Sequence, residues 1–362
     1  MLLFFLSLTL LEMPDWHVGE TGIFQPIQQD EAVVDSSGHV YVVNFPEAEI
    51  MHFDANGKRL GTIGRKGKGP GEFTYPRTLL VHGEKLYVSD ILNKQMSVFD
   101  RNGTYQTRFL LPYREMALAK IKGGWIYGNW NSFMQDGPPA AYWASEDFSE
   151  TREIYKFKEK CLIQGMMTTV NNGKRVSRYS PINSRPIMVA SPDGSKVYIT
   201  DMGKARILVI DGEKGTLGEP IEYKARPIPF DSDWADEEFK KRMEGRPKGK
   251  TDKIYPDNFP FARGFRYYND TLILDRWRGK PDDNHWELAL TAKGKETSSP
   301  VSWKVLERLI GVADGNAYVT LYDDETEEAG FARVDVTQLT DFIAANPINY
   351  DGDIGYSITI SN

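Results

Sequence analysis

The chain has 362 residues, of which 40% are hydrophobic and 12% aromatic, and it carries a formal net charge of −7. It can bury a large core, and its negative charge argues against broad, sequence-independent binding to nucleic acid, which depends on neutralising phosphates. The single cysteine, Cys161, excludes an internal disulfide and every multi-cysteine metal site, and the 5 histidines show no zinc-type spacing.

The N-terminus reads "MLLFFLSLTLLEMPDWHV" and opens with an apolar run that is too short to span a bilayer. The run suits the hydrophobic region of a signal peptide, although a basic start and a small-residue cleavage site are lacking. We therefore predict an apolar export segment at residues 1–22, a periplasmic or secreted protein, and no transmembrane span. The alternative is a buried first strand.

The stretch "IGRKGKGPGEFTYPR", residues 63–77, has the glycines of a phosphate-binding loop. Such a loop needs a helix behind it, because the helix N-terminus supplies the amides that hold the anion. The next residues read "RTLLVHGEKLYVSD", which is the pattern of a β-hairpin around Gly83. The sequence therefore predicts a connection between strands rather than a nucleotide site.

A short repeat, a turn followed by an apolar-Tyr-apolar segment and then a polar residue, recurs along the chain. Most intervals between copies are close to the 40 to 45 residues or so of a four-stranded propeller blade. The intervals on either side of the fourth copy are longer and need insertions. The central residues of the copies are Tyr41, Tyr87, Ile126, Tyr198, Leu272 and Tyr318.

Residues 63–109, "IGRKGKGPGEFTYPRTLLVHGEKLYVSDILNKQMSVFDRNGTYQTRF", resemble an NHL-type repeat of the six-bladed β-propellers, especially the exported bacterial NHL and TolB-like group. Residues 23–64 and 185–223 match more loosely. The resemblance implies an all-β, six-bladed propeller at residues 23–346, with a C-terminal tail at 347–362 packed on it. It implies no single activity, because propellers serve as binding scaffolds, sensors, lyases and lactonases.

In this family's geometry the starts of the innermost strands, the ends of the second strands and the connections between blades share one face, where propellers usually bind ligands. Counting along hairpins places Arg77 opposite Asp90 and Arg308 opposite Leu321. The predicted ligand-binding residues are Arg77, Arg114, Arg185, Arg263 and Arg308 from the inner strands and Asn44, Asp90, Asn129, Asp201 and Asp275 from the second strands.

Two interpretations of the arginines stay open. Each arginine can pair with a carboxylate of its own blade, which would stabilise the sheet by about 0.2–1 kcal/mol. Alternatively, Arg114 and Arg308, which have no such carboxylate directly opposite, bind an anionic ligand through guanidinium forks.

Residues 231–260 form a predicted helical insertion between blades four and five. Ser232 or Asp233 can cap a helix whose acidic first turn and basic later turn suit the helix dipole. Trp234, Phe239 and Met243 offer apolar contacts. The insertion is either a lid over the ligand-binding face or a passive cover.

The rival enzymatic hypothesis is a metal-dependent lactonase that recruits Glu31, Asn129, Asp201 and Asp275 around a divalent ion. The short motifs associated with such enzymes are not visible, and nearby arginines would oppose a cation. We predict a monomeric, non-catalytic binding propeller without cofactor or metal. Its expected ligand is an anionic small molecule, glycan or peptide, with a protein partner as a further option and nucleic acid excluded.

Overall fold

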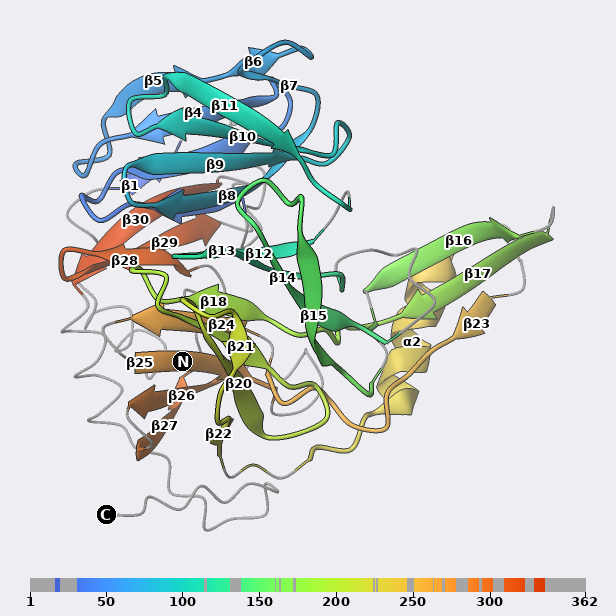
Figure 1. The fold of residues 1–362 in the computed structure, drawn as a ribbon. Coiled ribbons are helices and arrows are strands. Elements are labelled where there is room, and N and C mark those ends of the chain that lie inside the picture. Colours follow the sequence, from blue (N-terminus) through green and yellow to red (C-terminus); the bar gives the residue numbers. More distant parts are fainter. Residues whose placement is uncertain are drawn as a thin grey trace. The chain divides into compact units, whose positions relative to one another are not determined.

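A computed structural model describes most of the chain, and the segments that it does not describe are drawn as a thin grey trace (Figure 1). The described residues are 17–19, 31–113, 116–130, 138–159, 161–162, 164–171, 174–223, 225, 227–245, 251–262, 264–268, 271–277, 286–292, 295–301, 309–322 and 329–335.

The described residues form six antiparallel sheets of at least four strands, here called blades one to six in chain order. Its contacts divide it into two compact units, and each unit holds three of the blades. The first unit contains blades one, two and six. Their strands are β2(Ala32–Val34), β3(Val40–Asn44), β4(Glu49–Phe53) and β5(Arg59–Ile63); β8(Pro76–His82), β9(Lys85–Asp90), β10(Gln95–Asp100) and β11(Tyr105–Leu110); and β28(Leu309–Ala313), β29(Asn316–Tyr322), β30(Ala329–Asp335) and β1(His17–Gly19).

The second unit contains blades three, four and five. In blade four the outermost position is shared by two short strands that both pair with β20. The strands are β12(Ala117–Ile121), β13(Gly124–Gly128), β14(Ala140–Ala144) and β15(Thr151–Lys156); β18(Met188–Ala190), β19(Lys196–Thr200), β20(Arg206–Asp211), β21(Thr216–Leu217) and β22(Ile221–Glu222); and β24(Gly264–Tyr268), β25(Thr271–Arg276), β26(Trp286–Ala292) and β27(Lys295–Val301).

The repeat predicted from the sequence is confirmed. Every central residue of the motif lies on the second strand of a blade, namely on β3, β9, β13, β19, β25 or β29. These strands are nearly fully buried where their side chains are described, because each lies between two other strands of its sheet and carries apolar side chains that pack in the core of its unit. The core of each unit is accordingly made of apolar side chains from facing blades, such as Tyr41 of blade one against Leu86 and Phe99 of blade two.

The expected register is correct at the turns and shifts further along. Val81 pairs with Leu86 and Val312 with Ala317, as predicted. An irregularity between Pro76 and Leu79 then places Pro76, and not Arg77, opposite Asp90. A bulge inserts a residue into one strand and shifts every later pair, and sequence periodicity does not reveal it.

Blade six shows the same kind of shift. An irregularity between Leu309 and Gly311 pairs Leu309 with Val319. The predicted partner Leu321 faces Gly330 on β30, and the preceding residue Arg308 lies outside the described residues.

Blade six is completed by the N-terminal segment. His17–Gly19 pairs antiparallel with residues 330–332 of β30, so that the first and last described strands share a sheet. Strand β1 precedes residue 23, where the propeller was expected to begin.

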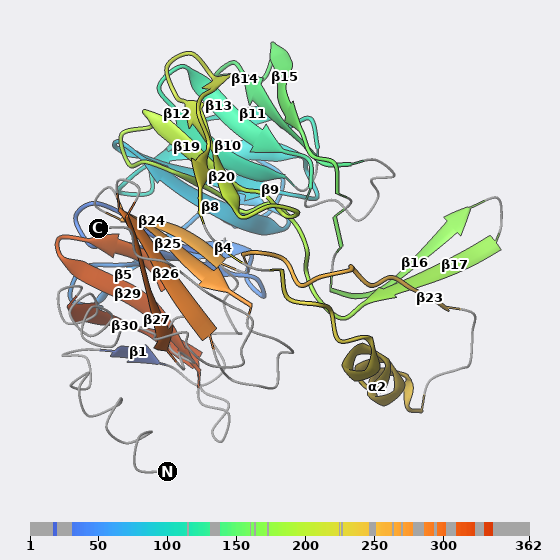
Figure 2. The same ribbon diagram turned by 90° about the horizontal axis from the view of Figure 1, so that it is seen from below.

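Two insertions of the second unit form one small substructure (Figures 1 and 2). The hairpin β16(Gly165–Asn171) and β17(Lys174–Ser180) lies between blades three and four, and β23(Thr251–Lys253) lies between blades four and five. Strand β23 pairs parallel with β17, which joins the two insertions into a three-stranded sheet. Helix α2 (Ser232–Met243) belongs to the second insertion.

The helix predicted in residues 231–260 is confirmed, with one correction at its start. Asp231 is the N-cap, since its side chain accepts a hydrogen bond from the Trp234 amide, whereas Ser232 and Asp233 lie inside the helix. The indole of Trp234 packs in a cluster with Phe259 and with Trp277, which follows β25 of blade five. The helix is therefore anchored to its own unit by aromatic contacts. No helix in the described part of the chain is long and apolar enough to cross a membrane.

Candidate functional site

Asp90, one of the predicted site residues, is a fully buried carboxylate at the end of β9. One oxygen accepts hydrogen bonds from the amides of Tyr75 (3.3 Å), Leu92 (3.2 Å) and Asn93 (3.1 Å). The other accepts from the Thr74 amide (2.6 Å) and the Asn93 side chain (2.8 Å). Asp90 therefore holds together the segment before β8 and the turn between β9 and β10.

Arg77 contacts a carboxylate of a neighbouring blade. Its Nη1 donates to Oε1 of Glu31 at 2.5 Å, and Glu31 is only 3% exposed at the start of β2. The guanidinium also lies over the Phe45 ring, 5.7 Å from the centroid. The expected pair of Arg77 with Asp90 is wrong, because the irregularity in β8 removes Arg77 from the position opposite Asp90.

Three further predicted residues at the ends of second strands are buried and hydrogen-bonded within their own blades. The Asn44 side chain donates to Glu49 at 3.1 Å, and the Asn129 side chain accepts from the Ala140 amide at 2.8 Å. Asp201 accepts from the Arg206 Nε at 2.7 Å. These residues connect the second strand of a blade to its third strand.

The remaining predicted residues are only partly described. Arg185 is half-buried near Cys161, whose thiol pKa is raised to about 12 by burial, so that this thiol stays protonated at neutral pH. Arg114, Arg263 and Arg308 lie outside the described residues. Asp275 pairs with Gly264 through the backbone of β25, and its side chain is not described. Convergence of the arginines on one anion therefore stays a prediction.

An exposed apolar surface that the sequence analysis missed lies at the same end of blade two as Asp90. Four of the six large apolar side chains found exposed among the described residues come from this blade. They are Tyr75 (40% exposed), Leu92 (48%), Leu110 (72%) and Tyr113 (41%), and we call them the docking face. Their only sequence signal is that apolar residues occupy turns and strand ends, where polar residues are usual.

Backbone contacts bring the segments that carry Tyr75, Leu92 and Leu110 to one end of the blade, and Tyr113 follows Leu110 by three residues. The Asp90 carboxylate binds the amides of both Tyr75 and Leu92, and the Tyr75 carbonyl accepts from the Ile91 amide at 3.2 Å. The Lys94 carbonyl accepts from the Leu111 amide at 2.8 Å, which joins the same turn to the end of β11. A fully buried carboxylate thus positions an exposed apolar surface.

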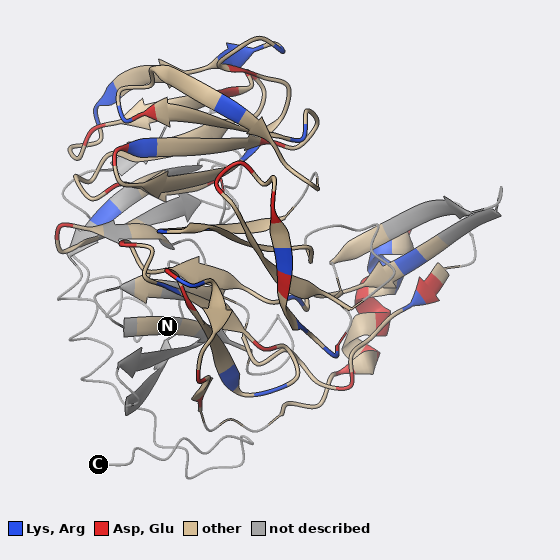
Figure 3. Ribbon diagram, in the orientation of Figure 1, with Lys and Arg blue, Asp and Glu red and all other residues tan. Residues whose placement is uncertain are grey.

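The segments next to the docking face carry several lysines and arginines. Lysines and arginines are coloured blue on β6(Arg65–Lys66) and on β11 in Figure 3. Arg108 of β11 donates to the Lys68 carbonyl at 3.2 Å, so the glycine-rich loop lies against this strand. Among the described residues, Lys66, Lys68, Lys94 and Arg108 form no salt bridge.

The glycine-rich loop at residues 64–75 holds a carboxylate of its own. Glu72 of β7(Glu72–Phe73) accepts from the amides of Gly69 (2.8 Å) and Lys68 (3.1 Å) and from Arg65 (2.9 Å). The Gly69 hydrogen bond is the largest of the effects that lower the Glu72 pKa. Because this side chain already occupies the loop amides, the loop is a connection between strands, as predicted, and not a phosphate cradle.

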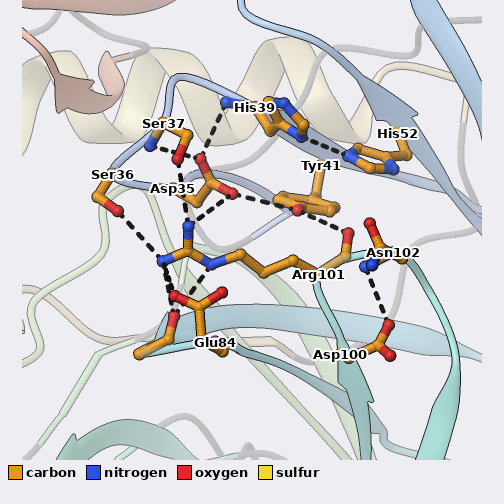
Figure 4. A network of polar contacts seen from close by, with 11 residues as sticks. Asp35, Ser36, Ser37, His39, Tyr41, His52, Glu84, Asp100, Arg101 and Asn102 are labelled. Carbon is orange, nitrogen blue, oxygen red and sulfur yellow. Dashed lines mark hydrogen bonds and ion pairs between the residues drawn. The ribbon is translucent and has the colours of Figure 1, made fainter.

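A second polar network lies at the opposite strand ends of blades one and two (Figure 4). Arg101 donates to the Gly83 carbonyl at 2.9 Å and to the Ser36 hydroxyl at 3.1 Å. His39 Nδ1 and His52 Nε2 lie 3.0 Å apart, and the His52 ring stacks on Tyr41. This network ties two blades together through their turns.

Comparison with known proteins agrees with this architecture. Residues 24–169 match the model of a family described as a 6-bladed beta-propeller. The chain is a six-bladed β-propeller. The fold class expected from the sequence, all-β with six blades and a short helical insertion, is thereby confirmed. A search of curated proteins finds no match to this propeller.

Solved structures also resemble this propeller. A candidate exported protein from Bacteroides fragilis is similar with a TM-score of 0.51 and 12% identity, over 89% of this chain and 96% of that chain. A virginiamycin B lyase from Staphylococcus aureus has a TM-score of 0.40 and 13% identity, over 88% of this chain and 98% of that chain. The calcium-binding protein regucalcin from Agrobacterium tumefaciens has a TM-score of 0.39 and 12% identity, over 90% of this chain and 93% of that chain. At these identities the likeness concerns the fold alone.

Proposed function

We propose that this propeller is a non-catalytic binding module that docks a protein partner on the docking face of blade two. The observation that carries the proposal is the concentration of exposed Tyr75, Leu92, Leu110 and Tyr113 at one end of one blade. Exposed apolar side chains that gather in one region mark interaction sites more often than single exposed apolar residues, which are ordinary. Asp90 supports the proposal because it fixes the two segments that carry Tyr75 and Leu92.

The experiment is a selection of displayed random peptides on the immobilised full chain. We expect enriched clones whose synthetic peptides bind the wild type and lose at least about tenfold in affinity for the Leu92→Ser, Leu110→Ser double variant. Leu60→Ser, Leu217→Ser is the matched control, since it removes two exposed leucines from other blades. Circular dichroism melting verifies that both variants fold. Equal losses in the two variants, or no enriched clone, would contradict the proposal.

The lactonase alternative receives little support from the residues it would recruit. Glu31 binds Arg77, Asn129 binds the Ala140 amide, and Asp201 binds Arg206. Within the described ranges, no three or more His, Cys, Asp and Glu residues gather as a metal site. Metal analysis of the purified protein decides the question: stoichiometric calcium or zinc that only a chelator removes would favour an enzyme.

An anionic ligand at the inner strand ends remains part of the proposal, and it now depends on Arg114 and Arg308, because Arg77 already contacts Glu31. Calorimetric titration with acidic oligosaccharides and carboxylate-rich peptides tests it. We expect salt-sensitive binding to the wild type that the Arg114→Ala, Arg308→Ala double variant lacks. Unchanged binding would leave these arginines a structural role.

We further propose that the protein is exported and loses its apolar start by cleavage before His17, because cleavage after residue 22 would remove β1 from blade six. The apolar run in residues 2–11 motivates the proposal, and the similarity to a candidate exported protein supports it. Cell fractionation with N-terminal sequencing tests the idea. A cytoplasmic protein that retains Met1 would rule it out.

A further inference from the structure

The partner of the docking face can be described chemically from the charges around it. Residues 63–113, which include blade two and the loop before it, contain eight Lys and Arg residues and four Asp and Glu residues, although the whole chain carries −7. Blade two is therefore a local basic surface on an acidic protein. Such a surface attracts acidic partners over a distance of about one Debye length.

The four carboxylates of this segment already form hydrogen bonds or ion pairs with other groups. Asp90 is fully buried under five hydrogen bonds, and Glu72 is bound by Arg65 and loop amides. Asp100 accepts from the Asn102 and Thr104 amides of its own turn, and Glu84 lies 3.3 Å from Arg101 at the opposite strand ends. None of them neutralises the cations beside the docking face within the described part of the chain.

Strand β11 adds a backbone element to this surface. It is the outermost strand of its sheet, and no described strand pairs with its outer edge. Arg108 pairs with Ser97 and Leu110 with Gln95, so Arg108 and Leu110 lie on the same face of the strand. An exposed edge of this kind accepts an extended chain as an additional strand, with side-chain pockets giving specificity.

We propose that the docking face binds an extended, acidic segment of another protein chain that lies along β11. Apolar side chains of this segment contact Leu110 and Leu92, which lie at the β11 side of the docking face, and its carboxylates contact Lys68, Lys94 and Arg108. This inference rests on the proposed function and adds to it the chemistry of the partner.

The peptides enriched in the selection described above test the inference. We expect them to combine Asp or Glu with apolar residues, and we expect the affinity of the tightest synthetic peptide to fall as ionic strength rises. A Lys68→Glu, Lys94→Glu double variant should weaken that peptide at least about tenfold and select basic peptides instead. Lys58→Glu, Lys85→Glu, which changes exposed lysines at the opposite strand ends, is the control with the same net charge.

The two proposals fail in different ways. Enriched peptides that depend on Leu92 and Leu110 but are neutral or basic would overturn the acidic partner and keep the docking face. Acidic peptides that bind the charge-reversed and wild-type proteins equally would also overturn it. A proline scan of the tightest peptide tests the added strand: tolerance of proline at every position would contradict pairing along β11.

Discussion

The guanidinium of Arg101 and the carboxylate of Asp35 lie 3.7 Å apart and connect a turn of blade two to a turn of blade one. Asp35 is buried, and Arg101 also donates to the Gly83 carbonyl and to Ser36 and Ser37. The contact belongs to no strand ladder. It holds two sheets together through side chains at their ends.

Replacing Arg101 with alanine should lower the free energy of unfolding by about 2–3 kcal/mol, because it leaves the buried Asp35 carboxylate without its cation. Chemical denaturation measures this loss. The control is Arg65→Ala, which removes an arginine that is 80% exposed and paired with Glu72, and which should cost about 0–1 kcal/mol. Equal losses in the two variants would show that Arg101 does not hold the blades together.

His52 should make stability depend on pH. Burial, and then the neighbouring His39, lower the His52 pKa below its usual 6.5, while Asp35 and Asp54 oppose the shift. The unfolded chain therefore binds the proton more readily than the folded chain. The contribution of neutral His52 to the free energy of unfolding is complete above about pH 6.5. It is lost as pH falls from there toward the pKa of the folded state, by at most about 1.4 kcal/mol per pH unit.

Denaturation of the wild type and of His52→Gln at several pH values between 7.5 and 5 measures this dependence. We expect a shallower fall in stability for the variant, since glutamine keeps a polar side chain beside His39 but does not titrate. Parallel curves would mean that other groups cause the loss at low pH.

Because β1 completes blade six, the stability of N-terminal truncations should depend on whether they keep this strand. Removal of residues 1–16 leaves His17–Gly19 in place, whereas removal of residues 1–19 deletes the pairs with Gly330, Phe331 and Ala332. We expect the second truncation to cost about 2–4 kcal/mol more, at about 0.5–1.5 kcal/mol for each hydrogen bond lost. Differential scanning calorimetry compares the two. Identical melting would contradict closure by β1.

Asp90→Asn tests the carboxylate that positions the docking face. The amide keeps one acceptor oxygen but turns donors toward backbone amides, so we expect a loss of about 2–3 kcal/mol. Asp54→Asn is the matched control, since Asp54 accepts from the Asn56 and Lys58 amides in an exposed turn. Hydrogen exchange at Tyr75 and Leu92 should accelerate in Asp90→Asn alone. Unchanged exchange there would remove the positioning role.

The blade pattern was predictable from the sequence because its signals are local. The continuous apolar runs around Tyr41, Tyr87 and Tyr198 indicate strands that are buried on both faces. The turn that pairs Val81 with Leu86 is set by residues close in sequence. The helix start at Asp231 was predicted to within two residues for the same reason, since capping involves a single turn of chain.

The details of the site depend on contacts between segments far apart in the sequence. Arg77 meets Glu31 because a bulge frees it from its own ladder and the neighbouring blade brings Glu31 beside it. Strand β23 joins β17 across the whole of blade four. Neither contact can be read from the sequence pattern. The spacing of apolar residues shows which face of a strand is buried, but it does not show which distant segment packs or pairs there.

The sequence by itself determined the all-β class, the repeating blades and the presence of a helical insertion, because alternation and turn residues act over a few residues. Only the tertiary structure decided that Asp90 is buried beneath amides, that Glu72 accepts hydrogen bonds from its own loop, and that Tyr75, Leu92, Leu110 and Tyr113 are exposed. Exposure and charge pairing are properties of neighbouring segments, and those neighbours exist only after the sheets have packed.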